Sequence, residues 1–271
     1  MESQERIAAF AELEREFIQA GGTAWPYLHD HFARFAATKR EFDRTRTTGT
    51  GALLDIGAHW LHQSVLWAMD GWNAIAVDLA VTFEIACVRD IAARHAIRLL
   101  PNTNLEKPGA LATLPGDSID AVLFTEIIEH ITFNPISLWR EIHRVLRPTG
   151  CLIVTTPNYY ALRGRAWSPL RFATGRGGGL STQSLLGEPT FSHHWKEYSR
   201  AELESYFAEL SADFRVDKAL HMPEYRPERF TSAIGKSVMA IETMIPGLRP
   251  NLHFEIGLRD KRHGVIAEPR W

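Results

Sequence analysis

Short apolar runs alternate with amphipathic stretches through the middle of the chain. Five runs have the length and apolar content of buried strands, at residues 52–56, 74–77, 97–100, 121–125 and 151–155. The stretches 81–95 and 135–146 instead place their apolar residues at helical spacing. Strands that are apolar on both faces and alternate with helices are typical of a parallel sheet covered on both sides. The pattern therefore predicts an α/β fold.

Two further amphipathic helices are predicted before the first strand. Apolar residues recur at steps of three and four through residues 1–20, and again from Tyr27 to Phe42. A stretch rich in threonine and glycine then separates these helices from the first strand. We predict that residues 1–46 form an N-terminal helical lid on a single domain of residues 47–271; ordinary packing of the two helices is the alternative.

An insert at residues 158–197 interrupts the regular pattern after the fifth strand. Its first part is rich in glycine and carries four arginines without an acid, Arg163, Arg165, Arg171 and Arg176. Irregular segments of this length are usually lids, binding loops or disordered. Because arginine binds phosphate and carboxylate in bidentate fashion, the insert could hold an anionic substrate, and a solvated loop is the alternative. Beyond it, helices are predicted near 199–210 and 231–244 and strands near 214–219 and 252–257.

The composition excludes several classes of protein. Thirty Lys and Arg residues against 32 Asp and Glu give a formal charge of −2, unlike a dedicated nucleic-acid-binding protein. Cys87 and Cys151 are the only cysteines and lie far apart, so no disulfide framework or cysteine metal site is predicted. The polar N-terminus is unlike a signal peptide, and no apolar run approaches the roughly 20 residues that span a bilayer. We therefore expect a cytoplasmic protein with neither a nucleic-acid partner nor a membrane span.

Acidic residues end the first two predicted strands. Asp55 and Gly57 close the first strand, and Asp78 closes the second. In open parallel sheets, ligands bind at the carboxyl ends of the strands, where an acid can accept hydrogen bonds from both hydroxyls of a ribose. The spacing predicts a nucleoside-containing ligand. The alternative is that Asp55 and Gly57 build a tight turn and Asp78 caps the next helix.

The residues after Gly57 bear on which nucleoside is bound. A dinucleotide site needs further glycines, so that the backbone can approach the pyrophosphate. His59, Trp60 and Leu61 occupy these positions here. S-adenosylmethionine has no pyrophosphate, so the loop favours a methyl donor over NAD. An NAD-dependent reductase is the weaker alternative.

Longer stretches of the chain resemble a known family. Residues 114–130 contain the strand Asp-Ala-Val-Leu-Phe followed by Glu-Ile-Ile-Glu-His, and residues 140–158 pass from a helix into a strand that ends in Thr-Pro-Asn. Residues 191–199 resemble the segment that opens a late helix. These motifs are similar to class I S-adenosylmethionine-dependent methyltransferases, in particular ubiquinone/menaquinone-type and bacterial sugar and natural-product enzymes. The resemblance implies a Rossmann-like, mostly parallel seven-stranded sheet with an antiparallel last strand and helices on both faces.

The resemblance also implies a set of cofactor contacts. They are Asp55, Gly57 and Ala58 for the methionine part, Asp78 for the ribose, Asn104 and Leu105 for the adenine, and Thr125 and Glu126 beside the sulfonium, with His59 and Leu79 as further cofactor contacts. The chain departs from the family at His59 and Leu61, where glycines are usual, and at Asn104, where an acid is usual. An asparagine can still bond the adenine amino group through its side-chain oxygen.

Histidines near the acceptor side are the predicted catalytic residues. Methyl transfer is an in-line displacement at a carbon activated by positive sulfur, so the protein mainly aligns the reactants. A hydroxyl acceptor must also lose its proton, which suits a histidine with a pKa near neutrality. His130 is the first candidate and His193 and His194 follow, with helix capping or solvation as alternative roles. No catalytic metal is predicted, because the motif that ends at His130 lacks the His-Glu-x-x-His pattern.

We therefore predict a methyltransferase that uses S-adenosylmethionine and methylates an oxygen of a small molecule or saccharide. The acceptor is expected to be anionic if the insert arginines bind it. The alternative is a non-catalytic protein that kept the fold as a partner or regulatory subunit, for which His59, Leu61 and Asn104 are the evidence.

Overall fold

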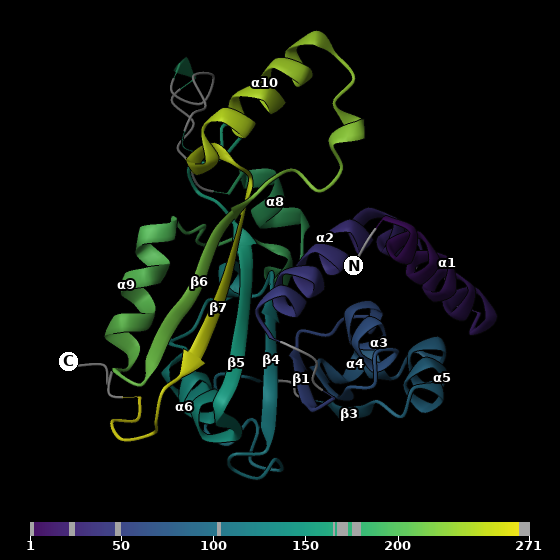
Figure 1. The fold of residues 1–271 in the computed structure, drawn as a ribbon, viewed down its shortest axis with the longest axis vertical. Coiled ribbons are helices and arrows are strands. Elements are labelled where there is room, and N and C mark those ends of the chain that lie inside the picture. Colours follow the sequence, from purple (N-terminus) through teal and green to yellow (C-terminus); the bar gives the residue numbers. More distant parts are fainter. Residues whose placement is uncertain are drawn as a thin grey trace.

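The computed structural model describes residues 3–21, 25–46, 50–101, 104–164, 166, 173–174 and 180–265. Its centre is a seven-stranded sheet (Figure 1). The strands are β1 (Ala52–Ile56), β2 (Asn73–Asp78), β3 (Arg98–Pro101), β4 (Ile119–Thr125), β5 (Leu146–Pro157), β6 (Phe214–Met222) and β7 (Asn251–Leu258), in the spatial order β3-β2-β1-β4-β5-β7-β6. The pairs from β3 to β5 are parallel, and β7 runs antiparallel to both of its neighbours. The predicted Rossmann-like sheet with an antiparallel last strand is confirmed.

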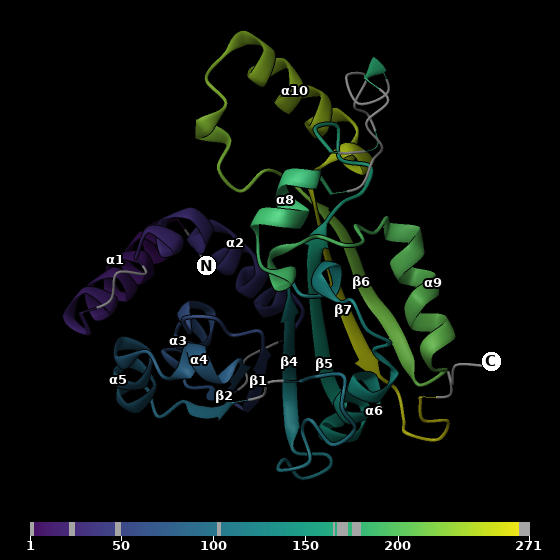
Figure 2. The ribbon, with the colours of Figure 1, turned by 180° about the vertical axis from the view of Figure 1, so that it is seen from behind.

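Helices cover both faces of the sheet. The helices are α1 (Ser3–Gln19), α2 (Trp25–Thr45), α3 (His62–Ala68), α4 (Ala80–Phe83), α5 (Ala86–Arg94), α6 (Ile136–Val145), α8 (Thr182–Gly187), α9 (Arg200–Leu210) and α10 (Ala233–Met244). Of these, α10 lies beyond the ends of the strands (Figure 1). Figure 2 shows the same arrangement from behind. None of the described helices is long and apolar enough to cross a bilayer.

Successive side chains of the strands point to opposite faces of the sheet and contribute to two separate apolar cores. Leu53 of β1 packs in one core with residues of α1, α2, α3 and α5, whereas the next residue, Leu54, packs in the other with residues of α6 and α9. Successive side chains of a strand point to opposite faces, so a strand that is apolar throughout requires cover on both sides. This is why the central strands carry unbroken apolar runs.

The two N-terminal helices belong to the first core. Leu13 and Phe17 of α1 are completely buried, and Phe35 and Phe42 of α2 are nearly so. At the start of α2, Tyr27 lines the cavity described below. Residues 1–46 are thus packed helices, and their action as a lid stays a prediction.

The stretch predicted as one helix at residues 81–95 is two helices, and the prediction of a single helix is wrong. Ile85 has an extended backbone (φ −65°, ψ 125°) and separates α4 from α5. Its side chain is partly exposed, away from the buried positions Phe83, Cys87 and Ile91. Apolar spacing alone does not reveal this break, because both short helices keep the same register of buried positions.

Only part of the insert is described, including α8 and Arg163. The Arg163 guanidinium lies 3.0 Å from carboxylate oxygens of both Glu242 and Glu224, and it stacks on the ring of Phe230. Arg163 therefore joins the insert to α10 and the segment before it. Arg165, Arg171 and Arg176, which the anion-binding prediction also used, lie outside the described residues.

Ala96 provides a test of the backbone at the end of α5. The amide of Ile97 donates to the Ala92 carbonyl and that of Ala96 to the Ala93 carbonyl, an arrangement that places Ala96 at φ 52°. Since an L-residue in this left-handed region costs about 1 kcal/mol, Ala96→Gly is expected to raise the free energy of unfolding by about that amount in urea denaturation. Ala93→Gly, one turn earlier in regular helix, is the matched control and should lower it by about 1 kcal/mol. Destabilisation by both variants would contradict the argument.

Candidate active site

A cavity of about 630 Å³ opens at the carboxyl ends of β1, β2 and β4. All ten residues predicted to contact the cofactor line it, namely Asp55, Gly57, Ala58, His59, Asp78, Leu79, Asn104, Leu105, Thr125 and Glu126. His130 lines it as well, whereas His193 and His194 do not. The fold therefore brings together residues spread over 76 positions of the sequence, from Asp55 to His130.

The turn after β1 has the conformation of a glycine-rich loop although two of its positions are not glycine. Gly57 has φ +78°, and His59 and Leu61 also lie in the left-handed region, at φ 48° and 69°. The His59 amide donates to Asp78 Oδ2 over 2.7 Å, and the Leu61 side chain is completely buried. Leu61 and Trp60 do not line the cavity. The bulky residues thus leave the cavity open, and only His59 borders it.

Asp78 is held by the segment that leads into α4 and also borders the cavity. Its Oδ1 accepts hydrogen bonds from the Leu79 amide at 2.7 Å and the Thr82 hydroxyl at 3.0 Å, but the N-cap of α4 is Leu79, so the alternative that Asp78 itself caps this helix is wrong. Its Oδ2 accepts from the His59 amide, and the side chain borders the cavity. A carboxylate offers about four lone-pair positions, so acceptor capacity remains for a ligand.

Asp55 is the buried acid of the site. Its side chain is almost inaccessible, and its Oδ2 accepts a 2.6 Å hydrogen bond from the Ser64 hydroxyl of α3. Burial raises the pKa of Asp55 to about 7, and the neighbouring charge of Asp78 contributes in the same direction. The carboxyl is therefore poised to change its charge near neutral pH.

Asn104 and Leu105 border the cavity beyond β3. The side-chain oxygen of Asn104 accepts a 2.9 Å hydrogen bond from the Glu106 amide. This bond orients the side-chain amide and uses one of the two lone pairs of the oxygen.

The end of β4 is fixed by side chains from other elements. The Thr125 hydroxyl donates to Gln63 Oε1 of α3 over 3.0 Å. Glu126 has a left-handed backbone (φ 56°), and its carboxylate accepts from the Thr155 hydroxyl at 2.8 Å and pairs with Arg34 Nη1 of α2 at 3.2 Å. Both members of the ion pair are largely buried. The Arg34–Glu126 pair therefore ties α2 to the end of β4.

His130 presents one ring nitrogen as an acceptor. It ends the 3-10 helix η1 (Ile128–His130), and its Nδ1 lies 3.0 Å from the backbone carbonyl of His193. A carbonyl can only accept, so Nδ1 carries the hydrogen and Nε2 holds a lone pair. Burial and the neighbouring His194 lower the pKa of His130, which keeps the ring neutral at pH 7.

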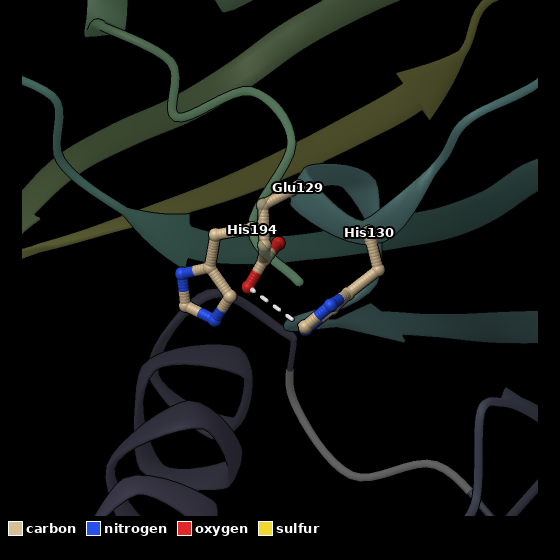
Figure 3. Close-up of side chains that lie close together, drawn as sticks. All are labelled: Glu129, His130 and His194. Atoms are coloured by element: carbon tan, nitrogen blue, oxygen red, sulfur yellow. Dashed lines mark ion pairs between the residues drawn. The ribbon is translucent and has the colours of Figure 1, made fainter. Parts of the chain in front are cut away.

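Glu129 lies behind His130 as a buried carboxyl. Its Oε2 accepts a 2.9 Å hydrogen bond from the Thr156 hydroxyl, while Oε1 lies 3.9 Å from His130 Nε2 (Figure 3). Oε1 is buried and has no hydrogen-bond partner in the described part of the chain. Burial, reinforced by the charge of Glu126, holds the pKa of Glu129 well above its usual range.

His193 and His194 lie beside His130 without bordering the cavity. The two rings of His130 and His194 meet edge to face with their centroids 4.7 Å apart. His193 is 3% exposed and contributes its backbone carbonyl to His130. The three predicted catalytic histidines are thus neighbours, but only His130 reaches the cavity.

Several cavity residues outside the predicted cofactor contacts come from helices that precede or follow β1; of these, Tyr27 and Arg34 belong to the predicted lid, whereas His62 and Gln63 were not predicted. Tyr27 and Arg34 belong to α2, and His62 and Gln63 to the start of α3. Burial raises the pKa of the Tyr27 phenol, and Arg34 lies close enough to oppose this shift. A weak signal was present, since Tyr27 and Arg34 are polar groups within an apolar helix face.

Part of the chain matches a known protein family. Residues 54–154 match the family model of a methyltransferase domain, and this range contains all ten predicted cofactor contacts and His130. No curated protein matches the chain in sequence.

Solved structures with the same fold were found at low sequence identity. An S-adenosylmethionine-dependent methyltransferase from Mesorhizobium loti is 14% identical, with 81% of this chain and 97% of that chain covered and a TM-score of 0.53. Geranyl diphosphate C-methyltransferase from Streptomyces coelicolor A3(2) is 16% identical, with 85% and 83% covered and a TM-score of 0.52. Phosphoethanolamine N-methyltransferase 2 from Haemonchus contortus, solved with S-adenosyl-L-methionine, is 16% identical, with 91% and 56% covered and a TM-score of 0.53. Together with the sheet order, the matched segment shows that the chain contains a methyltransferase domain with the class I fold.

Proposed function

We propose that the protein transfers the methyl group of S-adenosylmethionine to an oxygen atom of a small molecule or saccharide. The observation that carries the choice of oxygen is His130, whose ring borders the cavity with a lone pair at Nε2. A hydroxyl is the common acceptor that must lose a proton during transfer, so a neutral imidazole at this position fits its chemistry. The proton would pass from the acceptor hydroxyl to Nε2 as the new carbon–oxygen bond forms.

In the proposed complex the cofactor lies across the ends of the first four strands. Its methionine part contacts Asp55 and the turn at Gly57, its ribose hydroxyls donate to Asp78, and its adenine lies beside Asn104. The sulfonium then faces the end of β4 at Thr125. This pose is supported by the cavity, which all these residues line. The contribution of the protein is mainly to align donor and acceptor.

The pKa of Asp55 leads to an expected pH dependence of cofactor binding. Below pH 7 the carboxyl is protonated and must lose its proton before it can attract the ammonium group of the cofactor, whereas above pH 7 it is already charged. Affinity for S-adenosylhomocysteine is therefore expected to rise about tenfold from pH 6 to pH 8 in calorimetric titrations. Asp55→Asn should bind with a nearly constant, weaker affinity. A pH dependence that persists in this variant would show that another group is responsible.

The role of His130 is tested by separating binding from transfer. Acceptor panels of phenols, sugars and nucleotide sugars are screened by mass spectrometry for the gain of one methyl group. With the acceptor found, His130→Gln is expected to lower kcat by about 10²–10⁴-fold while S-adenosylhomocysteine binds as before. His29→Gln, at an exposed position of α2, is the matched control and should leave kcat unchanged. Full activity of His130→Gln would remove its role as base.

The nature of the acceptor does not follow from the fold. The similar structures include a geranyl diphosphate C-methyltransferase in complex with geranyl diphosphate and a phosphoethanolamine N-methyltransferase in complex with phosphomonomethylethanolamine. An anionic acceptor would need a cation at the cavity. Arg34 lines the cavity, but it is partly engaged by Glu126.

The cytoplasmic location also stays a prediction. The two free, buried cysteines agree with it.

A non-catalytic partner protein is the alternative function. Its evidence was the loss of glycines at His59 and Leu61, which would close the cofactor site. The left-handed backbone at both positions and the burial of Leu61 instead leave the cavity open. The two functions differ in one measurement, since only the enzyme needs to bind S-adenosylhomocysteine.

A further inference from the structure

Three side chains that can bind metal converge beside the acceptor end of the cavity. Glu129, His130 and His194 each offer one ligand atom, and these atoms all lie within 4.8 Å of one another (Figure 3). We propose that they form a binding site for a divalent transition-metal ion of the Zn²⁺ type. The proposal rests on the proposed function only for the position of the acceptor. It differs from the sequence-based prediction of no catalytic metal. That prediction used only a motif of residues close together in sequence, whereas His194 is distant in sequence from Glu129 and His130.

The carboxyl of Glu129 is the strongest indication of a ligand. The side chain is completely buried, and its Oε2 is held by the Thr156 hydroxyl at 2.9 Å. Its Oε1 faces the imidazole of His130 but has no hydrogen-bond partner among the residues that the structure describes. Leaving a buried polar atom without a partner is energetically costly, so such atoms are rare unless they have a function. A cation between Oε1 and the two rings would satisfy this oxygen.

The orientation of His130 matches that of a metal-binding imidazole. Histidines that bind metals usually donate their other ring N–H to a carbonyl or carboxylate, which fixes the tautomer. The His193 carbonyl accepts from Nδ1 and leaves Nε2 free to coordinate. Nε2 also lies 3.9 Å from Glu129 Oε1.

His194 comes from a segment that is anchored to Glu129 itself. The amides of Trp195 and Lys196 lie 2.7 and 3.3 Å from the backbone carbonyl of Glu129. The His194 ring also lies near Glu197, whose carboxylate is 3.7 Å from Nδ1. A tetrahedral ion with bonds of about 2.1 Å needs ligand atoms about 3.4 Å apart. His194 is one-third exposed, so rotation of this side chain can close the remaining distance.

The donor set indicates the class of ion. Two imidazole nitrogens and one carboxylate suit Zn²⁺ and its neighbours in the first transition row, whereas Mg²⁺ prefers oxygen ligands. Three protein ligands leave a position open towards the cavity that His130 lines. An ion held there would supply Lewis-acid chemistry that lowers the pKa of an acceptor hydroxyl, and His130 Nε2 would then serve as its ligand in place of the base role proposed above.

A second cluster with similar residue types lacks the same features. Asp213, Asp260 and His263 also lie within reach of one another. The Asp213 carboxylate, however, accepts hydrogen bonds from the backbone amides of His263 and Gly264 and pairs with the ring of His143. Its oxygens already have partners, so this cluster provides a control instead of a candidate.

The experiment measures metal binding directly, without cofactor or acceptor. Metal-stripped protein is titrated with Zn²⁺ against a chromophoric chelator, and with Co²⁺ to record visible absorption bands from nitrogen ligands. The expected result is one Zn²⁺ per chain with micromolar or tighter affinity. Glu129→Gln and His194→Asn should weaken this binding by about 100-fold or more and abolish the Co²⁺ bands. His263→Asn, in the second cluster, should change neither.

The outcomes separate this proposal from the methyltransferase site. Circular dichroism and thermal unfolding establish that each variant is folded, and titration with S-adenosylhomocysteine reports the cofactor site independently. Zn²⁺ binding that is absent in the unsubstituted protein, or equally strong in Glu129→Gln and His194→Asn, would overturn the proposal. Loss of binding in His263→Asn alone would assign the ion to the second cluster and overturn it as well.

Discussion

Asp78→Ala is expected to weaken the binding of S-adenosylhomocysteine by at least about 100-fold. In the proposed pose two ribose hydroxyls donate to this carboxylate, and a hydrogen bond to a charged group contributes about 1.5–3 kcal/mol. The variant also removes the acceptor of the His59 amide, which holds the turn after β1 in place. Isothermal titration calorimetry on the purified variant measures the effect.

Thr82→Ala is the matched control for this substitution. The Thr82 hydroxyl donates to Asp78 Oδ1, so its removal leaves the carboxylate and its other hydrogen bonds in place. Affinity is expected to fall by less than about tenfold, the equivalent of a single neutral hydrogen bond. Similar affinities for Asp78→Ala and the unsubstituted protein would show that the ribose is not bound at β2.

Gly57→Ala is expected both to destabilise the fold and to block the cofactor. At φ +78° an alanine costs about 1–2 kcal/mol, which denaturant unfolding would detect. The added Cβ would also lie 2.1 Å from Ile127 Cδ1, so the Ile127 side chain must turn away. Ile127 borders the cavity, and its displacement is expected to lower the affinity for S-adenosylhomocysteine by an order of magnitude or more.

The control for Gly57→Ala is Gly264→Ala. Gly264 has a similar backbone conformation, φ +64°, but a Cβ there would meet no atom within 4 Å. This variant should therefore show the backbone cost with unchanged cofactor binding. If both variants bind S-adenosylhomocysteine equally well, Ile127 does not transmit the substitution to the cavity.

The fold could be predicted from the sequence because burial on both faces leaves a strong local pattern. The unbroken apolar run of β4 and the alternation of strands with helices indicated the parallel sheet, and the family resemblance supplied the antiparallel last strand. The break at Ile85 was missed, because two short helices with buried residues in the same register give the pattern of one long helix. Local spacing reports which face is buried, but it does not report where the backbone changes direction.

The site could be predicted where its residues follow a strand. Asp55, Asp78 and Glu126 end β1, β2 and β4, and parallel strands bring such ends to one edge of a sheet. Arg34 and Gln63 reach the same cavity from helices, and their positions depend on packing between α2, α3 and the sheet. That packing involves contacts distant in sequence, which no local motif records.

The conformation of the turn was the least predictable feature. His59 and Leu61 looked like obstacles, because residues with side chains rarely adopt positive φ. The structure keeps the conformation through the hydrogen bond from the His59 amide to Asp78 and the burial of Leu61. The identity of a residue therefore did not decide the shape of its backbone here, since tertiary contacts offset the local cost.

The burial of α1 and α2 has a practical consequence for work with shortened chains. The segment that matches the methyltransferase domain begins at residue 54, beyond both helices. A chain cut there would expose the side chains against which Phe17, Phe35 and Phe42 pack, including Trp67 and Val65 of α3. An apolar face of this kind promotes self-association in solution. Expression of the matched segment alone would therefore favour aggregates. The two helices keep the segment soluble by covering its apolar face within the same chain.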